Sequence, residues 1–395
     1  MKKILLLLGF FAYISAFCPA QALENTTGIT FIYINGSNNL AYNNRLKFKT
    51  TFINNVNKMH PEIKKRFEDD KLIKQHVLKN GNFTINDEPI PFYWGDRSLN
   101  IVEHIDRDLA AAKKYSPKIA HQARTVFAHC LHDAVWVQKP QNMKAVIDDL
   151  HKIVQVETKK GNKVVLLGYS AGSFVTYQYY LNKSTSITSQ VIANKDYNKE
   201  ITEFINQNPS IPTCFDALID TDLIRYNAET GKYKPIDNVE VFKNNYKNLD
   251  KITSTACFEN GNVKGIVGFA SPARLFYSDF IDNKSSINYI SRLMAKSIVE
   301  NDVFYLTVNY NNDPFGFSNA ENFTYKKLQD NDYNIIYNSK IGQGFIYNKS
   351  NNYVPRTFVT SHLAYWDTPK RFAKAIVKAF NEGYSNFYSD MKWQF

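Results

Sequence analysis

The stretch KVVLLGYSAGSFVTY, residues 163–177, constrains the fold more than any other part of the sequence. Its apolar first half is typical of a buried strand, and the residues that follow it predict a helix. Between the two, GYSAG at 168–172 matches G-x-S-x-G, a pattern in which a serine stands on a sharp turn from strand to helix. Ser170 is therefore a candidate nucleophile, with Gly168 and Gly172 allowing a close backbone approach. The alternative is a small residue in a glycine-rich turn.

Strand-like and helix-like segments alternate along the chain. This order predicts an α/β fold with a mostly parallel sheet and helices on both of its faces. The strands are expected from Gly28 to the Asn35-Gly36 turn and within 89–96, 164–167, 263–272 and 303–310. Helices are expected within 44–80, 98–138 and 285–299, and an amphipathic one through 143–154 that ends at Gly161.

Two segments interrupt this alternation. Residues 182–260 are rich in Asn, Lys, Thr and Asp without a sustained period, and we expect them to form a cap inserted over one face of the sheet. Residues 97–138 are expected to be a helical insertion, in a single domain that spans 23–395. The polar, Tyr-rich residues 315–352 predict loops and short hairpins.

The end of the chain predicts a short strand, a loop that carries His362, and a final helix. Thr368 suits the N-cap of that helix, Pro369 its first turn and Gly383 its stop.

A serine hydroxyl attacks only when a histidine takes its proton, and a carboxylate must orient that histidine. After a strand-to-helix serine turn the chain order is serine, acid, histidine. His362 is the one histidine that follows Ser170, which makes it the candidate base; its alternative is a surface histidine without a partner. The other seven precede the serine: His60, His76, His104, His121, His129, His132 and His151.

Asp313 is the favoured acid because it follows the 303–310 strand and precedes Pro314, which enforces an extended turn. Its alternative role is that of a simple turn residue. Asp302 precedes the same strand and is expected at the opposite end of the sheet. Asp330 and Asp332, in a polar loop, remain alternatives.

Two backbone N–H groups are needed to hold the oxyanion that forms during such an attack. One comes from the residue after the nucleophile, Ala171, and the other from a loop after an early strand. The turn YINGSNN makes Ser37 the second candidate donor. Asn35-Gly36-Ser37 is also a glycosylation sequon, but a glycan there would block the site.

These motifs together resemble the α/β-hydrolase superfamily, and within it the lipase and esterase-like members. FIYINGSNN is similar to their strand and oxyanion loop, with Asn35 in place of the usual histidine, and VVLLGYSAGS is similar to their nucleophile turn. NNDPFG resembles their acid turn, and SHLAYW resembles their histidine loop. The resemblance implies an ester hydrolase with no cofactor, acting on a small-molecule or lipid ester that reaches the carboxyl ends of the strands under the cap. A serine peptidase or thioesterase of the same fold, or a catalytically silent binding or surface protein, remains open.

The first 22 residues are typical of a secretory signal peptide. Two lysines precede an apolar run, and Ala20-Gln21-Ala22 forms a small-x-small cleavage site, so we expect export to the periplasm or secretion. A retained membrane anchor is the alternative. The net charge of +11 comes from scattered lysines, which argues against nucleic-acid binding and leaves weak association with an anionic membrane surface open.

Three cysteines follow the signal peptide, so an exported chain leaves at least one of them unpaired: Cys130, Cys214 and Cys257. Cys214 and Cys257 share one irregular region and are the preferred disulfide pair. Cys and His spacings resemble no metal site, and we expect none.

Overall fold

The structure, a computed structural model, describes residues 27–37, 45–115, 117–193, 202, 224–235, 257–272, 294–316 and 344–392. The expected signal peptide lies outside the described residues. Of the expected cap, 182–260, the structure describes only 182–193, 202, 224–235 and 257–260.

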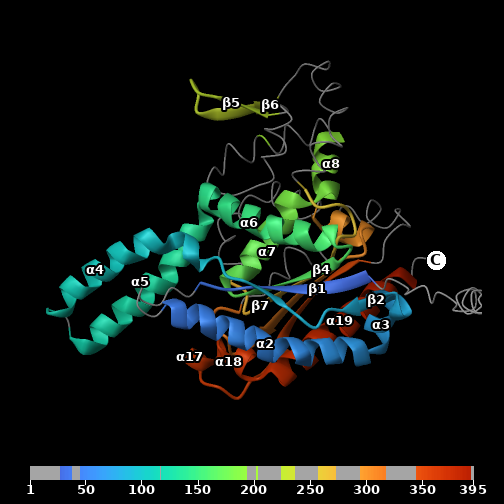
Figure 1. Cartoon of the computed structure of the whole chain (residues 1–395), viewed down its shortest axis with the longest axis horizontal. Helices are drawn as coiled ribbons and strands as arrows, with labels where there is room; N and C mark the ends of the chain where they lie inside the picture. Colours follow the sequence, from blue (N-terminus) through green and yellow to red (C-terminus); the bar gives the residue numbers. More distant parts are fainter. Residues whose placement is uncertain are drawn as a thin grey trace, which may run out of the picture.

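Among the described residues, seven strands form one sheet in which every paired neighbour is parallel (Figure 1). The order is β2-β1-β4-β7-β8-β9, and β3 pairs with β1 further along the edge that β2 occupies. The strands are β1 (Thr27–Ile34), β2 (Phe83–Ile85), β3 (Ile90–Phe92), β4 (Lys163–Tyr169), β7 (Val263–Phe269), β8 (Phe304–Tyr310) and β9 (Phe345–Asn352). The predicted α/β fold is confirmed.

Helices bury both faces of the sheet, and each strand contributes to both because successive side chains point to opposite faces. In β1, Ile32 and Ile34 join the apolar cluster on one face, while Phe31 and Tyr33 join the cluster on the other. The first face packs on α5 (Lys118–Gln138), α6 (Pro140–Lys159) and α7 (Ala171–Lys183). The second packs on α2 (Arg45–Asp69), α18 (Ala364–Asp367) and α19 (Pro369–Lys392), so the helices form layers above and below the sheet in Figure 1.

Local sequence signals account for several helix ends. Pro140 begins α6, and Gly161, with φ +86°, follows its end as expected. Asp70 caps α3 (Lys71–His76) by accepting hydrogen bonds from the amides of Leu72 and Ile73, each 3.0 Å long. Thr368 immediately precedes α19, which begins at Pro369 as predicted.

The remaining described elements are short or lie at the margins of the sheet. Residues 98–138 are mostly helical as expected, in α4 (Leu99–Lys113) and α5, which pack against each other. Further elements are two 3₁₀ turns, η2 (Lys79–Gly81) and η3 (Gly95–Ser98), the helices α8 (Thr185–Ala193) and α17 (Phe358–Ser361), and an antiparallel hairpin of β5 (Ile224–Asn227) and β6 (Lys232–Pro235). Residues 294–300 are helical as well.

Three local predictions near the end of the chain are wrong. Residues 345–352 form β9, a parallel partner of β8, rather than a loop or hairpin. Gly383 lies inside α19, where a Cβ atom would approach Tyr347 Cβ to 2.5 Å, so its small size serves close packing on β9 and does not stop the helix. The segment before His362 forms the helix α17 instead of a strand, and Ser361 Oγ in it donates to Asn312 O at 2.7 Å.

Candidate active site

Ser170 stands at the turn between β4 and α7 in a strained backbone conformation. Its φ of 51° and ψ of −125° lie outside the regions that non-glycine residues favour. The neighbouring glycines make this turn sterically feasible. A Cβ at Gly168 would lie 2.4 Å from Gly172 O, and one at Gly172 would lie 2.5 Å from Ile34 O. The sequence GYSAG therefore folds into the sharp strand-to-helix turn that its pattern predicts.

Strand β7 and helix α7 hold the Ser170 backbone in this position. Its N–H donates to Phe269 O of β7 at 2.9 Å, and its carbonyl accepts a hydrogen bond from Ser173 Oγ at 2.6 Å. Only 5% of the Ser170 surface is exposed. The side chain is thus fixed at the carboxyl end of the sheet, in largely dry surroundings.

His362 approaches Ser170 from the segment between α17 and α18. Its Nε2 lies 3.1 Å from Ser170 Oγ, within hydrogen-bond reach. Tyr169 holds the histidine from the strand side: its hydroxyl donates to His362 O at 2.9 Å, and the two ring centroids are 5.2 Å apart. The Phe315 ring contacts the imidazole edge to face, at a centroid distance of 5.0 Å.

Asp313 lies in the turn after β8, and its carboxylate faces the other imidazole nitrogen. His362 Nδ1 is 2.9 Å from Oδ1 and 3.1 Å from Oδ2 of Asp313. A carboxylate only accepts hydrogen bonds, so this contact places the imidazole proton on Nδ1 and leaves Nε2 as an acceptor for the Ser170 hydroxyl. Asp302 precedes β8 and lies at the opposite end of that strand, whereas Asp330 and Asp332 lie outside the described residues.

Tyr365, a residue that the sequence patterns did not single out, supports the Asp313 carboxylate. Its hydroxyl donates to Asp313 Oδ2 at 3.0 Å and accepts the Tyr310 N–H at 2.7 Å, while the amide of Phe315 donates to Oδ1 at 2.9 Å. Burial, and then the adjacent Asp313 carboxylate, hold the pKa of Tyr365 well above its usual range. The tyrosine therefore keeps its proton and remains a donor. In the sequence, only its position three residues after His362 could have pointed to Tyr365 as part of the site.

The loop after β1 lies directly against Ser170. A Cβ at Gly36 would come within 2.6 Å of Ser170 Cβ, so the next residue, Ser37, lies at the same carboxyl end of the sheet as Ser170. Ala171 is the first residue of α7, and its N–H is one of those that a helix leaves without an intrahelical partner. Both predicted oxyanion residues thus lie in the two segments that border the serine.

Asn35 fixes the course of this loop through its side chain and its carbonyl. Its Nδ2 donates to Gly36 O at 2.8 Å, and its Oδ1 accepts the Trp94 N–H at 2.9 Å. The indole Nε1 of Trp94 also donates to Asn35 O at 2.7 Å. The asparagine therefore has a structural function here, in which an amide both donates and accepts.

The Cys214–Cys257 disulfide stays a prediction, because only one of its two cysteines lies among the described residues. Cys257 is a buried free thiol with Sγ 3.7 Å from Thr188 Oγ1, and Cys214 lies outside the described residues. Burial raises the pKa of the Cys257 thiol, which disfavours the reactive thiolate. Across the described ranges, no group of three or more His, Cys, Asp or Glu side chains is arranged to hold a metal ion, and no helix is long and apolar enough to span a membrane.

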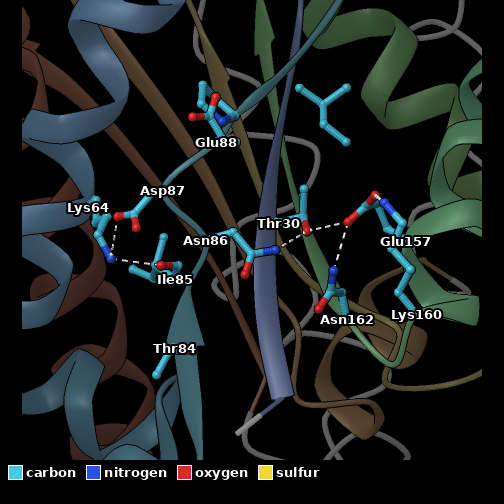
Figure 2. Close-up of a pocket in the computed structure, with 12 residues that line it drawn as sticks. Thr30, Lys64, Thr84, Ile85, Asn86, Asp87, Glu88, Glu157, Lys160 and Asn162 are labelled. Carbon is cyan, nitrogen blue, oxygen red and sulfur yellow. Dashed lines mark hydrogen bonds and ion pairs between the residues drawn. The ribbon is translucent and has the colours of Figure 1, made fainter.

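A surface pocket of about 620 Å³ lies beside β1, away from the three residues above (Figure 2). Its polar side chains bond to one another: Thr30 Oγ1 donates to Glu157 Oε2 at 2.7 Å and accepts from Asn86 Nδ2 at 2.7 Å, and Asn162 Nδ2 donates to the same Glu157 oxygen at 2.8 Å. These bonds fasten the β2–β3 loop to α6. None of Ser170, Asp313 and His362 lines the pocket.

Comparison with known proteins finds no counterpart for this chain: no protein-family model, no curated protein and no solved structure matches it.

Proposed function

We propose that the protein is an exported serine hydrolase, similar to the α/β-hydrolase superfamily, that cleaves carboxylic esters. The observation that supports this is the continuous chain of hydrogen-bonding contacts from Ser170 Oγ through the two His362 nitrogens to Asp313. A serine, an imidazole and a carboxylate in this order generate a nucleophile at neutral pH. The chain order Ser170, Asp313, His362 also agrees with that superfamily.

In the proposed reaction, Ser170 Oγ attacks the ester carbonyl carbon while His362 Nε2 takes the hydroxyl proton. Asp313 stabilises the imidazolium, and the N–H groups of Ala171 and Ser37 hold the oxyanion. The imidazolium then protonates the departing alcohol as its bond to carbon breaks, which leaves an acyl-enzyme. Water, deprotonated by the same histidine, releases the acid and restores the serine.

Two exposed apolar side chains beside the histidine favour an ester with an apolar group. Phe315 is 44% exposed and Leu363 is 51% exposed, and they border Asp313 and His362 in the chain. Large apolar side chains at the rim of a polar site provide surface on which an acyl chain or an apolar alcohol is removed from water. We therefore expect apolar esters to be better substrates than charged peptides.

Covalent labelling with a fluorophosphonate probe tests the proposal without knowledge of the substrate. Wild-type protein should label, and Ser170→Ala should not. Ser184→Ala is a matched control, because Ser184 is a buried serine at the far end of α7, and it should label like wild type. Circular dichroism establishes that all three proteins are folded. Absence of labelling in the wild type, or labelling of Ser170→Ala, would refute the proposal and favour a binding protein.

A panel of p-nitrophenyl esters of increasing acyl length, a thioester and aminoacyl amides then defines the substrate class. We expect esters to be turned over faster than amides. Phe315→Ser and Leu363→Ser should raise KM for the longer esters and leave that for the acetate unchanged. Faster cleavage of the amides would contradict the ester assignment while leaving the nucleophile intact.

A further inference from the structure

Helices α4 and α5 form a hairpin that extends away from the layered body (Figure 1). Its base is anchored in the protein: Ser98 Oγ donates to Asp133 Oδ1 at 3.1 Å, and the rings of Trp94 and Trp136 stack at a centroid distance of 6.2 Å. Trp94 also hydrogen-bonds Asn35 in the loop beside Ser170. The base of the hairpin therefore lies at the carboxyl end of the sheet, where the candidate active site also lies.

Charge is distributed unevenly along this hairpin. Residues 109–132 contain no Asp or Glu and four basic residues, Lys113, Lys114, Lys118 and Arg124. The acidic residues of the two helices lie outside this stretch, at Glu103, Asp106, Asp108 and Asp133. Residues 109–132 are therefore a basic stretch, and three of its four cations lie between positions 113 and 118.

The turn that joins the helices adds an aromatic side chain to this charge. Tyr115 is 82% exposed, and Lys114 Nζ lies 5.7 Å from the centre of its ring. Lys113, Lys114 and Lys118 are exposed around it. A tyrosine has an apolar ring and a polar hydroxyl, which suits the boundary between lipid and water. Lysines at the same level attract anionic headgroups.

We propose that the hairpin tip, through Lys113, Lys114, Tyr115 and Lys118, docks the protein on bilayers that contain anionic phospholipid. A convex tip with three lysines around one tyrosine matches a flat anionic surface, whereas a nucleic acid is bound along a groove or an extended basic face. This inference goes beyond the proposed hydrolysis, because the tip makes its contacts whether or not the serine reacts.

Co-sedimentation of the full chain with vesicles tests the docking. We expect wild-type protein to sediment with equimolar phosphatidylcholine and phosphatidylglycerol and to stay in solution with phosphatidylcholine alone. The variant K113Q/K114Q/K118Q should bind roughly 100-fold more weakly, since each lysine near an anionic surface contributes about fivefold. Tyr115→Ser should weaken binding without any change of charge.

A second triple variant, K152Q/K370Q/K378Q, removes the same charge from exposed lysines on α6 and α19 and serves as the control. It should bind nearly as well as wild type. The proposal would be overturned if both triple variants weakened vesicle binding equally, or if the tip variant bound vesicles like wild type. It would also be overturned if the tip variant lost oligonucleotide binding while it kept vesicle binding. Fluorophosphonate labelling of the tip variant should match wild type, so a failure of docking is distinguishable from a failure of the proposed hydrolysis.

Discussion

Replacing Gly36 with alanine tests whether the loop after β1 takes part in catalysis. The new Cβ would lie 2.6 Å from Ser170 Cβ and 2.9 Å from Tyr169 O. Carbon atoms pack at about 3.5 to 4.0 Å, so the loop and the serine must separate by about 1 Å. The Ser170 amide is tied to Phe269 O, and we therefore expect the loop, with the Ser37 N–H, to move.

The size of the effect follows from that displacement. Misplacement by 1 Å at a reacting centre lowers the rate by about 100-fold, and loss of one oxyanion donor by about 100- to 1000-fold. Gly36→Ala should therefore slow fluorophosphonate labelling by about 100- to 1000-fold. Because overpacking costs about 1 to 3 kcal/mol, the variant should also unfold at a lower temperature.

Gly383→Ala separates the two consequences. Its Cβ would be crowded to the same degree, 2.5 Å from Tyr347 Cβ, but at the contact of α19 with β9. We expect it to lower the melting temperature and to leave the labelling rate unchanged. The measurements are the second-order labelling rate constant and thermal unfolding by circular dichroism. A folded Gly36→Ala that labels within about tenfold of wild type, or an equal loss in Gly383→Ala, would refute the reasoning.

Two further predictions concern buried polar side chains, Tyr365 and His151. Tyr365→Phe removes a donor to Asp313, and since such a bond to a charged group contributes about 1.5 to 3 kcal/mol, labelling should slow by roughly 10- to 100-fold. A labelling rate equal to that of wild type would mean that Tyr365 only fills space. Burial, and then Lys183, lower the pKa of His151 to about 4, so the folded protein keeps this histidine neutral while the unfolded chain binds a proton below about pH 6.5. Stability should fall by about 2 kcal/mol between pH 7 and pH 5, as measured by urea unfolding, and His151→Gln should lose that part of the pH dependence; an unchanged pH dependence in the variant would contradict this assignment.

The parts of the site that the sequence predicted are those that depend on local chain geometry. Ser170 follows from five consecutive residues, because the strained turn needs small neighbours on both sides. Asp313 could be selected by its place after a strand, and His362 by chain order alone. The structure brings both within hydrogen-bond distance of the expected partners. Tyr365 could not be selected, because a tyrosine near a histidine is equally typical of core packing.

The fold could be predicted from the sequence where strands are apolar. The prediction failed where the burial of a residue depends on a partner distant in the chain. β9 has the polar sequence FIYNKSNN, yet its Lys349 is buried because the ammonium pairs with Glu382 of α19, far along the chain. That compensation cannot be read from either segment alone. The prediction that Gly383 stops the final helix failed for the same reason, since the glycine of α19 packs against Tyr347 of β9.

The parallel sheet has a consequence for how the chain must be synthesised. One edge of β1 pairs with β2 and β3, which end at Phe92, but its other edge pairs with β4, which begins at Lys163. At ribosomal rates of about 5 to 20 residues per second, the segment between Ile34 and Lys163 takes roughly 6 to 26 s to emerge. For that time an apolar strand presents an open edge, which is a template for aggregation. A molecular chaperone that shields this strand should therefore increase the yield of folded protein more than a lower temperature alone.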